Sequence, residues 1–67
     1  MNGKLMRQRR KELGMTQMQL AVAVGASSVT MVSNWEHGRA VASVPKLRKL
    51  AEVLGVTMEQ LLEDEED

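Results

Sequence analysis

The stretch TQMQLAVAVGASSVTMVSNW, residues 16–35, decides the fold of this 67-residue chain. Its first four residues match a capping box, in which the Thr16 hydroxyl and the Gln19 side chain reciprocally satisfy free backbone amides and begin a helix. Gly25 can adopt the left-handed conformation that ends one. Between these two signals, apolar residues recur at helical spacing and predict one buried face, made of Leu20, Ala21 and Val24.

A second helix follows the glycine turn. Either Ser27 or Ser28 can cap its start, and it is predicted to reach about residue 37. Val32 and Trp35 are three residues apart, which places both on the buried side of this helix. A helix, a glycine turn and a second helix form the layout of a helix-turn-helix, whose second helix enters the major groove of DNA. Generic helical hairpins share this pattern, so the spacing alone leaves both interpretations open.

The rest of the chain predicts three more helices, and strand signals are nearly absent. The first helix is expected over about residues 4–13, ending at Gly14. The fourth begins at Ser43, accommodates Pro45 in its first turn and ends at Gly55. A second capping box, residues 57–60, opens the fifth. The apolar positions of the last two helices are Leu47, Leu50, Ala51, Leu54, Met58, Leu61 and Leu62. We therefore expect an all-α fold, a compact five-helix bundle.

Length and composition limit the kind of protein this can be. Sixty-seven residues make one small domain, and without cysteine neither disulfides nor thiolate metal sites are expected. No apolar run approaches the roughly 20 residues that span a bilayer, and no signal-peptide pattern opens the chain. The sequence predicts a soluble, cytoplasmic protein with a helix-turn-helix domain over residues 1–62. Residues 63–67 are expected to form an acidic C-terminal tail that frays.

Charge is divided sharply along the chain, although the formal net charge is zero. Residues 1–49 hold all nine Lys and Arg against two acids, a net charge of +7, whereas residues 50–67 hold seven acids and no base, −7. Such asymmetry favours a basic surface for a polyanion together with an acidic tail. On charge alone, a segregated surface that is merely solvated is the alternative.

Three segments and one glycine extend the helix-turn-helix pattern over most of the chain: RRKELGMTQMQLA (9–21), Gly25, VSNWEHG (32–38) and LRKLAEVLGVTMEQLL (47–62). In this order and spacing they resemble the lambda-repressor-like, Cro/C1-type helix-turn-helix family of phage repressors, Cro proteins and small bacterial regulators. The resemblance covers about residues 5–62. It implies a transcriptional regulator that binds double-stranded DNA sequence-specifically, with a recognition helix at about residues 28–37 in the major groove.

The resemblance also implies roles for individual residues. Its base-contacting positions fall on Val29, Thr30, Ser33 and Asn34, and its phosphate-contacting positions on Thr16, Gln17, Ser28 and Arg39. Chemistry supports the first set unevenly. Asn34 can pair bidentately with an adenine edge, Thr30 and Ser33 with several bases, and Val29 only with a thymine methyl group. An ordinary polar helix face would explain the same four residues without DNA.

The resemblance also implies packing roles for three residues. Arg10 and Glu36 match an internal ion pair that joins the first helix to the end of the third, so Arg10 is expected to be structural. Gln17 matches a position that also braces the recognition helix. Because free amides at a helix N-terminus attract phosphate oxygens, Thr16 and Gln17 fit phosphate contacts there, although capping alone would also explain Gln17.

The chain departs from the family pattern at two points. Six residues, 26–31, separate Gly25 from Val32, where the pattern has five. The extra residue either lengthens the turn, so that Ser28 caps, or extends the helix, so that Ser27 caps and Val29 and Thr30 move relative to the groove. The usual proline before the fourth helix is also displaced: Ala42 occupies its place, and Pro45 lies three residues later.

An enzyme is not expected. The sequence has one histidine, no activated nucleophile arrangement and no glycine-rich phosphate loop, and no cofactor, metal or small-molecule effector is indicated. Residues 4–11 leave too little apolar face for a membrane-surface helix. The main alternative to DNA binding is a helical protein-interaction module, an antitoxin or adaptor of the same fold.

A single copy contacts too little DNA for useful specificity, so we expect a homodimer on a two-fold operator with half-sites about one helical turn apart. The predicted dimer surface is the apolar cluster of Met58 and Leu62 on the fifth helix, with Val56 nearby. The alternative is that these residues belong to the core, to which Leu61 is assigned. Repression by occluding a promoter is the expected output, and activation by contact with the polymerase is the alternative. The acidic tail is expected to shield the basic face or to discourage non-specific DNA binding.

Overall fold

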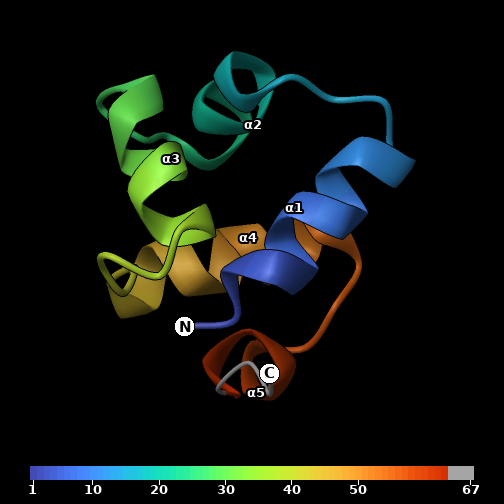
Figure 1. The fold of residues 1–67 in the computed structure, drawn as a ribbon, viewed down its shortest axis with the longest axis vertical. Helices are drawn as coiled ribbons and strands as arrows, with labels where there is room; N and C mark the ends of the chain where they lie inside the picture. Colours follow the sequence, from blue (N-terminus) through green and yellow to red (C-terminus); the bar gives the residue numbers. More distant parts are fainter. Residues whose placement is uncertain (64–67) are drawn as a thin grey trace.

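The computed structural model describes residues 1–63 and contains five α-helices and, within those residues, no strand (Figure 1). The all-α fold class is confirmed. In chain order the helices are α1 (Gly3–Glu12), α2 (Gln17–Val24), α3 (Val29–Glu36), α4 (Val44–Leu54) and α5 (Met58–Leu62). Residues 64–67, on which most of the predicted acidic tail falls, lie outside the described part of the chain. No helix in that part is both long and apolar enough to cross a membrane.

Side chains cap three of the five helix starts. The capping boxes predicted at Thr16 and Thr57 are both present, and the Asn2 side chain accepts from the amide of Leu5 to begin α1. At α3 and α4 the residues before the helix are Ser28 and Ser43, but neither side chain makes a capping hydrogen bond. The two serines therefore hold the N-cap positions, while the predicted capping contact itself is missing.

A left-handed glycine makes the turn between α2 and α3. Gly25 has a φ of 71°, and the next amide, that of Ala26, donates to the carbonyl of Ala21 at 2.9 Å. This pattern closes the C-terminus of α2 and reverses the chain. Because L-residues with a side chain rarely adopt this conformation, glycine is required for a turn this tight.

The five helices share one core. Its buried residues are Met6, Leu20, Ala21, Val24, Val32, Trp35, Ala42, Leu47, Leu50, Leu54 and Leu61. Leu61 belongs to this core, as the sequence predicted, whereas Ala51 is only partly buried. α2 and α3 pack on each other at one end of the molecule, and α5 lies at the other, against α4 and α1 (Figure 1).

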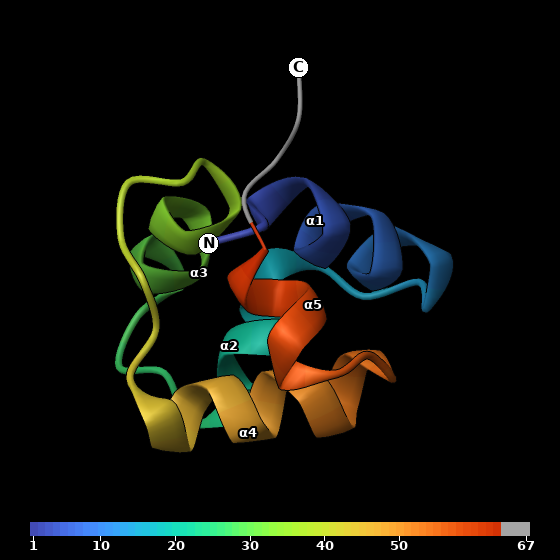
Figure 2. The ribbon, with the colours of Figure 1, turned by 90° about the horizontal axis from the view of Figure 1, so that it is seen from below.

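The start of α1 contacts the C-terminal ends of two other helices, α5 and α3. The Asn2 amide donates to the carbonyl of Leu61 at 2.7 Å, which joins the first turn of α1 to the end of α5 (Figure 2). Gly3 lies so close to the last turn of α3 that a Cβ there would be 2.5 Å from the carbonyl oxygen of Trp35. The beginning of α1 therefore lies between the C-termini of α3 and α5.

Candidate nucleic-acid interface

α3 is anchored by one side and accessible on the other. Val32 is fully buried and Trp35 only 2% exposed, so the core holds the helix from behind. On the other flank Thr30 is exposed, and Val29, Ser33 and Asn34 are partly exposed. The four predicted base-contacting residues are therefore all at least partly accessible to a ligand in this single chain.

The start of α3 settles how the extra residue is accommodated. The helix begins at Val29, and Ser28 precedes it in extended backbone, with φ −157° and ψ 159°. The insertion thus lengthens the turn and leaves Val29 and Thr30 in the first turn of the helix. Ser27 stands outside the helix, where its hydroxyl donates to the sulfur of Met31 at 2.9 Å.

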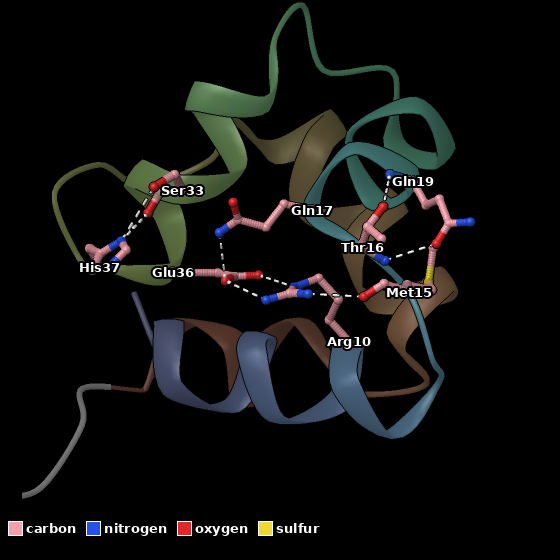
Figure 3. A network of polar contacts seen from close by, with 8 residues as sticks. All are labelled: Arg10, Met15, Thr16, Gln17, Gln19, Ser33, Glu36 and His37. Atoms are coloured by element: carbon pink, nitrogen blue, oxygen red, sulfur yellow. Dashed lines mark hydrogen bonds and ion pairs between the residues drawn. The ribbon is translucent and has the colours of Figure 1, made fainter.

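The polar side chains of α3 differ in whether they already make hydrogen bonds. Within residues 1–63, the side chains of Thr30 and Asn34 make no hydrogen bond. Ser33 is engaged locally, since its hydroxyl lies 3.4 Å from His37 Nδ1, which donates to the Ser33 carbonyl oxygen at 2.8 Å (Figure 3). Among the described residues, all side-chain donors and acceptors of Thr30 and Asn34 are therefore available to a ligand.

A buried polar network ties α3 to α1 and α2. Arg10 donates to the Glu36 carboxylate through Nε at 2.7 Å and through Nη2 at 3.2 Å, and through Nη1 to the carbonyl of Met15 at 2.9 Å. Gln17 Nε2 donates to Glu36 Oε1 at 3.1 Å (Figure 3). The Glu36 side chain is only 1% exposed, so its charge is balanced by Arg10 rather than by water. This network fixes the last turn of α3 against the start of α2.

The N-terminus of α2 lies at the edge of the same region. Thr16 is exposed, and its hydroxyl accepts from the amide of Gln19 at 3.0 Å. The hydroxyl hydrogen remains a donor, and the first amides of a helix have no partner within it. Gln17 donates one side-chain amide hydrogen to Glu36, and its side chain is partly exposed. Thr16 and Gln17 therefore combine a packing contact with donors suited to an anion.

Two cations flank α3. Arg39 is exposed, and its backbone amide donates to the carbonyl of Asn34 at 2.9 Å, which fixes the start of the loop after the helix. Lys46, on α4, places its ammonium group 3.8 Å from the position that a Cβ on Gly25 would take, beside the α2–α3 turn. Lys46 is not among the residues that the sequence predicts to contact DNA, because its proximity to that turn arises from the packing of α4 on α2.

The predicted dimer residues do not share one environment. Val56 and Met58 are partly buried against the core of their own chain, whereas Leu62 is 49% exposed. Other large apolar side chains are at least as exposed, among them Val22, Val41, Val44 and Met18. Of the three predicted residues, Leu62 is therefore the one most available to a second copy.

Comparison with known proteins gives one match. A protein-family model described as helix-turn-helix matches residues 6–61. No curated protein and no solved structure matches the chain.

Proposed function

Because the chain belongs to the Cro/C1-type, lambda-repressor-like helix-turn-helix family, whose domains bind DNA, we propose that it represses transcription as a homodimer on a two-fold operator. In this proposal α3 enters the major groove, and the protein acts in the cytoplasm without enzymatic activity. The observation that carries it is the exposed side of α3, where Thr30 and the partly exposed Asn34 make no side-chain hydrogen bond within residues 1–63. On the other side, Val32 and Trp35 anchor the helix in the core.

Base recognition is assigned to Val29, Thr30, Ser33 and Asn34. Asn34 carries the most sequence information, because an amide can both donate to and accept from an adenine edge. Phosphate contacts are assigned to Thr16 and Gln17 at the start of α2, to Ser28 before α3 and to Arg39 after it. Contacts of this kind set the orientation of the protein on the duplex without reading its sequence.

The proposal is tested by selecting bound sequences from a random duplex pool and then measuring two variants on the selected site. We expect Asn34→Ala to lose about 5- to 150-fold in affinity for that site, equivalent to ~1–3 kcal/mol, with unchanged affinity for random duplex. Arg39→Gln should weaken both equally and reduce the slope of log K against log salt by about 0.9, since one fewer phosphate is neutralised.

Two results would count against DNA binding. The first is a pool from which no sequence is enriched, and the second is an affinity for duplex that does not change with salt. Either result would favour the alternative function of a helical protein-interaction module. A selected site without two-fold symmetry would instead retain DNA binding and reject the homodimer.

A further inference from the structure

We propose that His37, at the C-terminal end of α3, is a further phosphate-contacting residue of the DNA interface and makes this contact only when both of its ring nitrogens are protonated. It stands outside both the base-contacting and the phosphate-contacting residues predicted from the sequence. The proposal rests on the proposed function and deepens it, because it makes the affinity for DNA depend on pH.

His37 lies on the same face of the helix as the predicted base-contacting residues. Thr30, Ser33 and Asn34 precede it by seven, four and three residues, spacings that place side chains on one side of an α-helix. His37 is the C-cap residue, and its backbone amide still donates to the carbonyl of Ser33 at 3.0 Å, as in a regular helical turn. It is exposed. The outward face of α3 therefore continues to the end of the helix.

A hydrogen bond fixes which ring nitrogen is available. His37 Nδ1 lies 2.8 Å from the carbonyl oxygen of Ser33, and because this oxygen can only accept, Nδ1 carries a hydrogen. Nε2 is then an acceptor in the neutral ring and a donor in the imidazolium. Figure 3 shows Ser33 and His37 together on the side of α3 away from Arg10. Within residues 1–63 Nε2 makes no hydrogen bond, so it is the nitrogen open to a ligand.

The ligand that fits this nitrogen is a phosphate. Because the N-terminal residues of a recognition helix contact the base edges, its last turn lies nearer the edge of the groove, where the phosphates run. A phosphate oxygen can only accept, so the neutral ring would turn a lone pair towards it. The imidazolium would instead donate a charge-assisted hydrogen bond. The contact is therefore present at low pH and lost as the ring gives up its second proton.

The charged groups around His37 also favour an anion. Arg39 is exposed and follows two residues later. Of the two helices that pack most closely on α3, α2 carries no charged residue, and the start of α1 carries Lys4 and lies beside the N-terminal amine. Glu36 is already paired with Arg10. Within residues 1–63 no carboxylate makes an ion pair with His37, so a phosphate would supply the counter-charge of the imidazolium.

Duplex affinity measured by fluorescence anisotropy at about pH 5.5 and pH 7.5 tests the contact. His37 is the only histidine, the side chain that ordinarily changes charge in this range. We expect wild type to bind the selected site about tenfold more tightly at the lower pH in ~50 mM salt, with a slope of log K against log salt steeper by about 0.9 per chain. His37→Gln, which gains no proton, should show neither change. His37→Lys, permanently charged, should bind equally at both pH values with the steeper slope.

The outcomes separate this proposal from the proposed function. Wild type that binds equally at both pH values, or a His37→Gln variant that keeps the rise, overturns the contact and leaves DNA binding intact. No duplex binding at either pH rejects both. A proton–nitrogen correlation NMR spectrum of the free protein at about pH 8 should show the ring hydrogen on Nδ1. A hydrogen on Nε2 would overturn the ring orientation that the contact requires.

Discussion

At the scale of single residues, Glu36 holds the most consequential position. It belongs to α3, yet its carboxylate points inward and accepts from Arg10 of α1 and Gln17 of α2. Its side chain is almost entirely removed from water. A buried charge of this kind is tolerated only while its partner remains, because removing either one strands the other. Glu36, on the inward side of α3, therefore helps to position the predicted base-contacting residues on the outward side.

Glu36→Gln is expected to lower the free energy of unfolding by about 3 kcal/mol, since the guanidinium of Arg10 would then be buried without a counter-charge. Urea denaturation followed by circular dichroism measures this. The matched control is Glu12→Gln, which breaks the exposed pair with Arg9, where the carboxylate is 50% exposed. That change should stay within about 0.5 kcal/mol of wild type. Equal losses in the two variants would contradict a structural role for the buried pair.

At the scale of elements, the N-terminus of α3 is left without a side-chain cap. Ser28 occupies the N-cap position but does not bond back to the helix. By contrast, the N-termini of α2 and α5 are capped by capping boxes. α3 thus lacks a capping hydrogen bond, a contact that commonly contributes about 1 kcal/mol to the free energy of unfolding. In the proposed complex, the same position faces a phosphate.

Ser28→Asp should therefore separate stability from DNA binding. A carboxylate at the N-cap accepts from the first amides and complements the helix dipole, so the free energy of unfolding should rise by about 0.5–1 kcal/mol. Its negative charge should lower duplex affinity about tenfold by repelling the phosphate. Thermal melts and a fluorescence anisotropy titration measure the two effects. Ser28→Asn, a neutral cap, should gain stability and keep its affinity; tight binding by the aspartate variant would place Ser28 away from the DNA.

At the scale of the whole molecule, size is the limiting property. The described chain measures 28 × 23 × 19 Å, while half-sites one helical turn apart are about 34 Å from centre to centre. One copy is therefore too small to reach two successive major grooves. In the proposed homodimer each copy would therefore occupy one half-site, and Leu62 is the residue of the predicted dimer surface that is most exposed.

Leu62→Glu tests that surface. We expect the wild-type chain to sediment as a dimer and the variant as a folded monomer, because Leu62 is half exposed in the single chain. Met58 is a poorer site for the test, since it packs against its own core. Val22→Glu, on α2, is the control and should remain dimeric, as Val22 is 75% exposed and outside the proposed surface. A dimeric Leu62→Glu would move the interface elsewhere.

Much of the fold could be predicted from local patterns. The two capping boxes and the glycines after α2 and α4 mark helix ends, and the spacing of Leu20, Val32 and Trp35 marks buried faces. Boundaries were less certain, as α1 begins and ends one residue earlier than expected. Met6 and Ala42 were not recognised as core residues, because burial depends on what packs opposite them.

The amino-acid sequence by itself determined the five helices, the turn at Gly25 and the identity of the side chains on the α3 flank, because all of these depend on neighbours within a few positions. Only the tertiary structure decided that the extra residue lengthens the turn, that Gln17 joins the Arg10–Glu36 pair and that α5 ends beside the start of α1. Each of these depends on contacts between distant segments, whose geometry is set when the helices pack around a common core.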